Sequence, residues 1–284
     1  MAKVKDVINS ILSTGIIDTG KVSGLSQQII AEMNLRVSGV LINFEDLPNL
    51  VFDAGEPGVR VYPFLQQAAK ESLRAAIRTN GGKKLILNSV YRTVAQQHIL
   101  YQVHLQDNSL VSQAASPGFS NHEDGLALDI QNFNDWANTL DSRPDWQWFG
   151  AGDEVHFTYT GSGVTDEIGF IGVEAFQSLW NKNNPNDQIG VDGDFGPQTA
   201  ARMNLSPAEG FGGRRVLILS TTTPMQGEDV RKVQQALTNA GFNAPLNGIY
   251  DAATVAEVVK FQTAKKLDPD GKVGPQTRRV LGIL

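Results

Sequence analysis

The amino-acid sequence predicts an α+β domain followed by small all-α repeats, and two observations support this fold class. Between residues 62 and 159, stretches with apolar residues at helical spacing are interspersed with short runs in which apolar and polar residues alternate. After Tyr159 this pattern ends, and an eight-residue motif recurs along the rest of the chain. The chain has 284 residues, 41% of them hydrophobic, which is enough for one substantial core and a smaller module.

The first predicted elements are a helix, a strand and a second helix. The helix covers residues 62–79, where Pro63 lies near the start and apolar residues follow at helical intervals. The strand lies within residues 84–91, where apolar and β-branched residues cluster after a Gly-Gly turn. Thr93 is then well placed to cap a helix over roughly residues 94–105.

Two later strands are predicted to present one polar side chain each to a shared cleft. In residues 125–130, which follow a Pro-Gly loop, Asp129 falls on the face opposite to Leu126, Leu128 and Ile130. Residues 154–159 alternate in the same way, so that His156 falls on the face opposite to the apolar set Val155, Phe157 and Tyr159.

The composition narrows the possible partners and chemistry. A net charge of -6 provides no broad cationic surface, so neither nucleic acid nor a membrane surface is expected as a partner. Because the chain has no cysteine, a transition-metal site would have to be built from histidines and carboxylates. Polar residues interrupt the apolar ones in residues 1–20, so we predict neither a secretory signal nor membrane insertion. The sequence gives no indication of an oligomeric state.

Two of the four histidines lie near the two later strands and suggest a metal site. A zinc hydrolase needs about three nitrogen or oxygen ligands and an open position for water, because the metal must both acidify the water and polarise the scissile carbonyl. His122, Asp129 and His156 are the predicted ligands. A further carboxylate must accept the proton of the water, and Asp153 is the candidate general base, with Glu154 as the less favoured alternative.

The other candidate polar residues have simpler interpretations. His98 and His104 lie six positions apart on a predicted helix and therefore on different faces, so we interpret both as structural. Glu123 and Asp124 are interpreted as solvated carboxylates or as residues that support the metal ligands.

The motifs around these residues match those of a known family. The pattern Ser-x-His-x-x-Gly-x-Ala-x-Asp occupies residues 120–129, and an acidic residue-x-x-His element occupies residues 153–156. A Tyr-Arg-Thr element at residues 91–93 is followed by Gln97 and by a Leu-Tyr pair. Over about residues 85–159 the chain thus resembles the D-alanyl-D-alanine carboxypeptidases of vancomycin-resistance type and the related L-alanyl-D-glutamate endopeptidases of phage endolysins.

The resemblance implies a D,D-peptidase or hedgehog-like fold and a zinc peptidase that cuts the peptidoglycan stem peptide. One Zn²⁺ is the implied cofactor. The oxyanion of a tetrahedral intermediate also needs a fixed cation nearby. The implied site residues are the ligands His122, Asp129 and His156, the base Asp153, the oxyanion partner Arg92, and the substrate-binding residues Ser120 and Gln97.

Three functions remain open at this stage. D-alanyl-D-alanine carboxypeptidase is our first expectation, although carboxypeptidase members often carry Glu at the base position, and Asp153 is similar to the endolysin branch. L-alanyl-D-glutamate endopeptidase is therefore the alternative. A non-catalytic wall-binding protein would need neither Asp153 nor Arg92, so their presence argues against it. Action on the wall implies the periplasm or the outside of the cell, reached by an export route other than a recognisable signal peptide.

The recurring motif points to a wall-binding module. DGDFGPQT at 192–199 recurs as DGKVGPQT at 270–277, and NGIYDAAT at 247–254 is a degenerate copy. A Phe-Gln or Val-Gln pair precedes each copy on a predicted helix. Residues 227–284 resemble the small helical peptidoglycan-binding domain of many wall hydrolases, and residues 166–205 resemble half of such a unit. Peptidoglycan is therefore the expected partner.

These patterns predict four parts in the chain. They are an N-terminal extension (1–39), a zinc peptidase domain (40–162), a partial peptidoglycan-binding-like repeat (163–209) and a peptidoglycan-binding domain (216–284). The glycine-rich residues 210–215 are predicted to form the linker before the last part.

Overall fold

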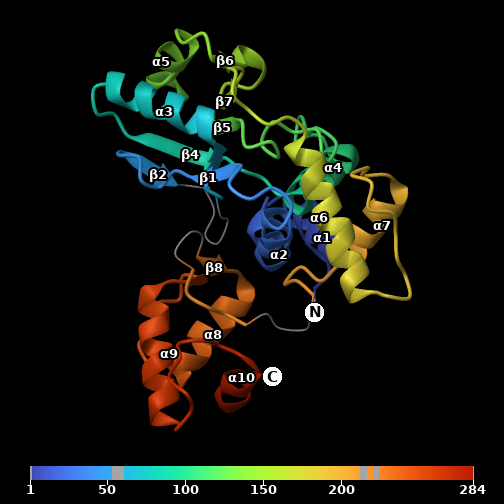
Figure 1. The fold of residues 1–284 in the computed structure, drawn as a ribbon, viewed down its shortest axis with the longest axis vertical. Helices are drawn as coiled ribbons and strands as arrows, with labels where there is room; N and C mark the ends of the chain where they lie inside the picture. The colour runs from blue at the N-terminus through green and yellow to red at the C-terminus, as the bar shows by residue number, and fades with distance from the viewer. Residues whose placement is uncertain (1, 53–60, 212–215, 221–223, 284) are drawn as a thin grey trace.

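The computed structural model describes residues 2–52, 61–211, 216–220 and 224–283 (Figure 1). Within these residues, five strands form one sheet in the order β2-β4-β5-β7-β6. The strands are β2 (Leu50–Phe52), β4 (Leu85–Ser89), β5 (Ala127–Ile130), β7 (His156–Tyr159) and β6 (Trp146–Trp148). β2 runs parallel to β4, and the remaining neighbours pair antiparallel. The strands predicted within residues 84–91, 125–130 and 154–159 are confirmed, and the register places Asp129 opposite both His156 and Ser89.

The helix predicted over residues 62–79 begins later in the structure. Helix α3 covers Gln67–Thr79, whereas Phe64–Gln66 form strand β3, which pairs antiparallel with β1 (Leu41–Asn43). The prediction was therefore wrong for residues 62–66. The strand that pairs with residues 64–66 lies more than twenty residues upstream, so no local pattern indicates it. The burial of Phe64 and Leu65 fits a helix and a strand equally well.

Helix α4 (Val94–Gln106) confirms the predicted helix and its cap. The Thr93 hydroxyl accepts a hydrogen bond from the Gln96 backbone N–H at 3.4 Å, and the Gln96 side chain accepts one from the Thr93 N–H at 3.1 Å. This reciprocal capping box satisfies two N–H groups at the start of the helix. The short elements η2 (Phe133–Asp135), α5 (Ala137–Asp141) and η3 (Gly150–Gly152) lie in the connections between β5 and β7.

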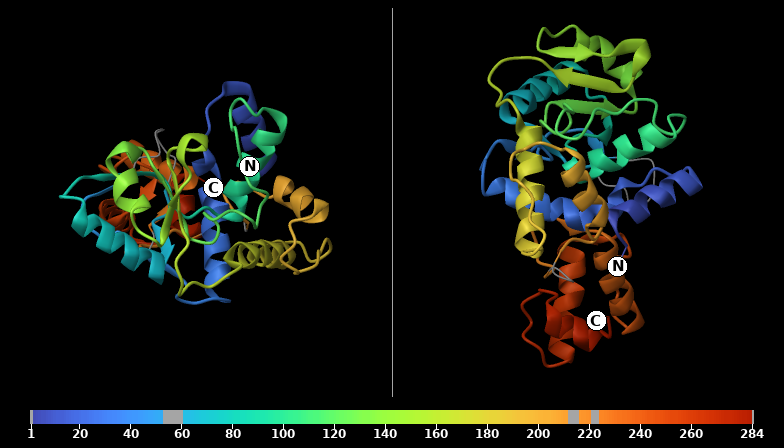
Figure 2. Two further views of the ribbon diagram at one scale, coloured as in Figure 1. Left: turned by 90° about the horizontal axis from the view of Figure 1, so that it is seen from above. Right: turned by 90° about the vertical axis from the view of Figure 1, so that its right-hand side faces the viewer.

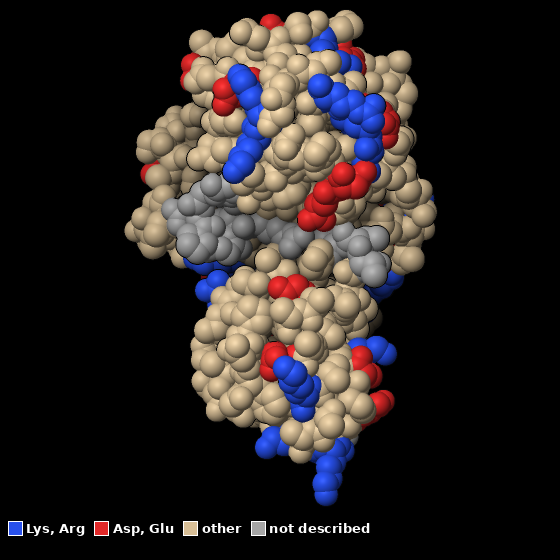
Figure 3. All heavy atoms as spheres, turned by 90° about the vertical axis from the view of Figure 1, so that its left-hand side faces the viewer, with Lys and Arg blue, Asp and Glu red and all other residues tan. Residues whose placement is uncertain are grey.

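The buried hydrophobic side chains of the described residues form three clusters. One cluster lies between α3 and the sheet. A second joins α1 (Val4–Thr14), η1 (Thr19–Val22), α2 (Ser23–Asn34), α4, α6 (Ile168–Asn183) and α7 (Pro197–Leu205). Figure 2 (right) shows this helical group between the sheet and the C-terminal helices. On the face drawn in Figure 3, acidic and basic side chains are interspersed.

The two ends of residues 2–211 meet inside the helical group. The Val4 N–H donates to the Ser206 carbonyl at 3.0 Å, and the Ala208 N–H donates to the Ala2 carbonyl at 2.9 Å. Segments 1–39 and 163–209 therefore pack together against α4. The predicted domain boundaries at residues 39 and 162 stay predictions.

The third cluster holds the C-terminal helices together. Its elements are β8 (Met225–Gln226), α8 (Glu228–Asn239), β9 (Ile249–Tyr250), α9 (Ala252–Ala264) and α10 (Pro275–Leu281). Of the predicted linker, residues 212–215 lie outside the described residues. No helix in the described part of the chain is both long and apolar enough to cross a membrane.

Each copy of the repeated motif is held by one buried glutamine from the preceding helix. Gln234 Nε2 lies 2.8–2.9 Å from Asn247 Oδ1, the Ile249 carbonyl and Thr254 Oγ1, and Gln234 Oε1 accepts from the Gly248 N–H at 2.8 Å. The same contacts recur for Gln177 with Asp192, Gly193, Asp194 and Thr199, and for Gln262 with Asp270, Gly271, Lys272 and Thr277. Gly193, Gly248 and Gly271 have φ angles of 74°, 70° and 66°, a region that other residues rarely adopt.

Candidate metal centre

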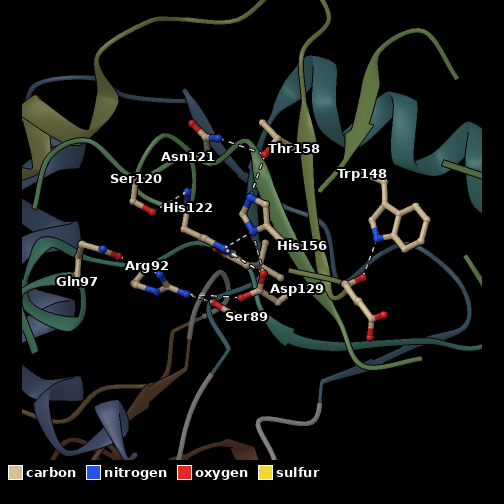
Figure 4. Close-up of polar contacts among 12 residues, drawn as sticks. Ser89, Arg92, Gln97, Ser120, Asn121, His122, Asp129, Trp148, His156 and Thr158 are labelled. Atoms are coloured by element: carbon tan, nitrogen blue, oxygen red, sulfur yellow. Dashed lines mark hydrogen bonds and ion pairs between the residues drawn. The ribbon is translucent and has the colours of Figure 1, made fainter. Parts of the chain in front are cut away.

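The three predicted ligands lie together on the sheet and on the turn before β5 (Figure 4). His122 Nε2 and His156 Nδ1 are 3.3 Å apart, and Asp129 Oδ1 lies 3.3 Å from the former and 3.0 Å from the latter. The antiparallel register of β5 and β7 places Asp129 and His156 side by side, and the turn at residues 120–125 brings His122 over them. Residues 34 positions apart thus form one compact cluster.

The geometry and chemistry of this cluster fit Zn²⁺. Ligand atoms about 2.0–2.2 Å from a tetrahedral zinc lie about 3.3–3.6 Å from one another, which is close to the separations between the three atoms here. Two imidazole nitrogens and one carboxylate oxygen are also a donor set found in catalytic zinc sites. The assignment of His122, Asp129 and His156 as zinc ligands stays a prediction that this arrangement supports.

Hydrogen bonds behind the cluster orient both imidazole rings. His122 Nδ1 lies 2.6 Å from the Val90 carbonyl, and because a carbonyl only accepts, this nitrogen carries the proton. The lone pair of His122 Nε2 therefore points into the cluster. His156 Nε2 lies 2.9 Å from the Thr158 hydroxyl, which is also bonded to Asn121. Each ring thus offers one nitrogen to the cluster and anchors the other.

The electrostatics set the protonation states that metal binding needs. Burial by itself raises the pKa of Asp129, but His122, His156 and Arg92 outweigh it and hold that pKa well below its usual range. Burial lowers the pKa of His122, and the charge of Asp129 only partly opposes this. A carboxylate and a neutral imidazole are the forms that coordinate metal ions.

A cleft of about 420 Å³ opens over the cluster and contains most of the predicted site. Asp153, Arg92 and Ser120 line it together with the three ligand residues. Burial, and next the charge of Asp129, raise the pKa of Asp153, which suits a carboxylate that accepts a proton near neutral pH. Glu154 is exposed and does not line this cleft. The geometry therefore favours Asp153 over Glu154 as the candidate base.

Of the residues predicted to contact the substrate, Arg92 and Ser120 line the cleft, whereas Gln97 does not. Arg92 directs Nη2 to Ser89 Oγ at 3.1 Å and lies 3.6 Å from Asp129 Oδ2. Gln97 is fully buried, and its Oε1 accepts from Arg92 Nη1 at 2.9 Å. Gln97 thus reaches the cleft through Arg92, while Ser120 lines the cleft itself.

The carboxylate Glu123 is buried and is not solvated. It is 1% exposed, and its Oε2 accepts hydrogen bonds from the backbone N–H groups of Gly118 and Ser120. Burial raises the pKa of Glu123 to about 8. These hydrogen bonds hold the turn that carries His122. Of the two interpretations made from the sequence, the supporting role therefore fits and the solvated carboxylate does not.

The remaining histidines lie outside the cluster, as the structural interpretation expects. His98 Nε2 lies 2.8 Å from Asn204 Oδ1, and His104 Nδ1 lies 2.8 Å from the Val111 carbonyl. Sequence reasoning missed Thr158, although its place two residues after His156 on the same strand face could have indicated it. It also missed Ile17 in the cleft wall, for which the sequence carries no signal.

Comparisons with known proteins identify two parts of the chain. Residues 64–161 match the family model described as D-alanyl-D-alanine carboxypeptidase, and residues 226–281 match the model described as putative peptidoglycan binding domain. Neither the comparison with curated proteins nor that with solved structures gave a match. The two family matches confirm the suspected family and the two-part architecture. A carboxypeptidase-type domain joined to a peptidoglycan-binding domain is the composition of a cell-wall peptidase.

Proposed function

We propose that this chain is a zinc-dependent peptidase that hydrolyses the D-alanyl-D-alanine bond of the peptidoglycan stem peptide. The observation that carries the proposal is the convergence of His122, Asp129 and His156 within 3.3 Å of one another, in a cleft that also contains Asp153 and Arg92. A protein that only binds the wall would need neither a base nor a cation beside such a cluster. The C-terminal domain would hold the enzyme at its substrate, in the periplasm or outside the cell.

The proposed mechanism divides the chemistry among these residues. His122, Asp129 and His156 would hold Zn²⁺, which when bound would supply a Lewis acid that acidifies water and polarises the scissile carbonyl. Asp153 accepts the proton of the attacking water and delivers it to the leaving amine. Arg92, held by Gln97 and Ser89, places a positive charge near the developing oxyanion. Under this proposal Gln97 is a positioning residue, because its own contact is to Arg92.

Mass spectrometry of muropeptides after incubation with the purified full-length protein tests the proposal. Release of free D-alanine identifies the carboxypeptidase, whereas cleavage between L-alanine and D-glutamate identifies the endopeptidase. The protein should lose activity on chelation and regain it with Zn²⁺, and Asp153→Asn serves as the inactive control. Unchanged muropeptides with zinc-loaded wild-type protein would refute the peptidase function.

A further inference from the structure

The active-site cleft includes one residue, Ile17, that lies outside the matched carboxypeptidase region. Apart from the metal-cluster residues, the cleft lining includes the aliphatic side chains of Ile17, Leu100, Leu110 and Val111, together with neutral polar and aromatic residues such as Ser112, Gln113 and Phe119. All four are half-buried, and Ile17, Leu110 and Val111 pack against the helical cluster. Ile17 belongs to residues 1–39, whereas the carboxypeptidase match begins at residue 64.

The segment that carries Ile17 is fixed to the helix that starts beside Arg92. Ser26 Oγ lies 2.8 Å from Thr93 Oγ1, and Gln96 Nε2 donates to Thr19 Oγ1 at 3.4 Å. Both bonds are buried and join η1 and α2 to the first turn of α4. The position of Ile17 between α1 and η1 is therefore determined by the same residues that cap α4.

The loop on the other side of Ile17 is packed closely as well. Gly15 ends α1 with φ of 71°, and a Cβ at this position would lie 3.7 Å from Leu110 Cδ2. Leu110 is thus in van der Waals reach of the turn that leads to Ile17. The aliphatic wall is formed by two segments almost a hundred residues apart, held in contact by the helical core.

The ionisable side chains that line the cleft lie outside its aliphatic wall. Among its described lining residues, the ionisable side chains are Arg92, Asp153 and the three ligands, and the guanidinium of Arg92 is engaged by Gln97 and Ser89. The aliphatic wall therefore offers no opposite charge to a carboxylate or an ammonium group, and the polar residues beside it, Ser112 and Gln113, are neutral. Burying an unpaired charge there costs far more than burying a methyl or methylene group gains.

We propose that Ile17, Leu100, Leu110 and Val111 form an aliphatic subsite that binds an uncharged aliphatic side chain of the substrate peptide next to the scissile bond. Ile17 is then a specificity-determining residue supplied by the N-terminal segment. The inference rests on the proposed peptidase function and adds to it a residue outside the matched region that determines which aliphatic side chain the cleft accepts.

A pair of adjacent isoleucines allows a matched test. Ile16 is 50% exposed and does not line the cleft, so Ile16→Ala is the control for Ile17→Ala. The full-length variants are assayed for kcat/KM on soluble peptides that differ only at a residue flanking the scissile bond: glycine, alanine, norvaline or aspartate. One methylene in a hydrophobic pocket contributes roughly 10-fold or more to discrimination. We therefore expect Ile17→Ala to reduce the norvaline-to-glycine ratio about 10-fold, with Ile16→Ala unchanged and Ile17→Leu close to wild type.

The outcomes separate the subsite from the peptidase and from a structural role. If Ile17→Ala changes kcat/KM for all peptides by one factor, or leaves all unchanged, the subsite is refuted. If wild-type protein cleaves none of the peptides, the proposed function fails, and calorimetric binding of the same peptides decides on the subsite. Norvaline-selective binding that Ile17→Ala abolishes would support the subsite, and equal binding by both proteins would overturn it. The melting temperature of each variant reports any loss of folding. If Ile17→Ala does not fold, the norvaline-to-glycine ratios of Ile17→Leu and Ile17→Met are compared instead.

Discussion

The glutamine that holds each repeated motif leads to a quantitative prediction for the C-terminal domain. Gln234 is fully buried, and Gln234→Leu removes its amide donors and the acceptor of the Gly248 N–H while keeping a similar volume. The two hydrogen bonds that the amide group can donate contribute about 1 kcal/mol each, and the buried Gly248 N–H left unsatisfied costs about 1–3 kcal/mol, so the loss is roughly 3–5 kcal/mol. Small domains are stable by only about 5–15 kcal/mol, so most of the stability of this domain would be lost.

Hydrogen exchange followed by mass spectrometry is the suitable assay, since all four tryptophans lie before residue 181 and their fluorescence reports on the rest of the chain. Peptides from residues 225–283 of Gln234→Leu should lose protection, and co-sedimentation with purified sacculi should fall with it. The control is Gln235→Leu: Gln235 is exposed and donates only to Asn239 on the same helix, so we expect a change within about 0.5 kcal/mol. Equal protection in the two variants would refute the idea that this glutamine stabilises the motif.

Further predictions concern the metal, the base, a buried histidine and the wall anchor. His122→Ala should lose stoichiometric zinc by metal analysis, and retention of zinc with wild-type activity would reject the ligand assignment. Asp153→Asn should keep zinc but lose about 10²–10⁴-fold in kcat, whereas Glu154→Gln should be mild; reversed phenotypes would identify Glu154 as the base. Burial lowers the pKa of His98, so the unfolded chain takes up the proton more readily and the free energy of unfolding should fall as the pH drops below about 6.5; His98→Gln should flatten that dependence in denaturation experiments. The truncated chain 1–211 should cleave a small stem peptide but sediment poorly with sacculi, and sedimentation equal to that of the full chain would exclude the anchor role.

Much of the sheet and of the candidate metal site could be predicted because their signals are local. Alternation along residues 125–130 and 154–159 indicates two strands with one polar side chain each, and the antiparallel register then brings Asp129 to His156. The capping residue Thr93 likewise indicates the start of α4 within the sequence around it.

The features that sequence reasoning missed depend on distant contacts. Whether residues 64–66 form a strand depends on β1, and the wall position of Ile17 depends on packing between α1, η1 and α4. Neither leaves a periodic pattern, because burial alone fits several backbone conformations. The glutamine contacts lie between these cases: the Gln and the turn were both visible in the sequence, but their hydrogen bonds span up to 22 residues.

The meeting of Ala2 and Val4 with residues 206–208 has a consequence for synthesis of the chain. While the protein emerges from the ribosome, α1 and α2 are made first, but α6 and α7, against which they pack, appear some 130–200 residues later. Before then α1 can already pack against α4, but α2 lacks its partner α6 and α1 lacks α7, so part of their apolar surface requires shielding from aggregation. Such a high contact order slows folding. The helical group can therefore close only after residue 208 has been made.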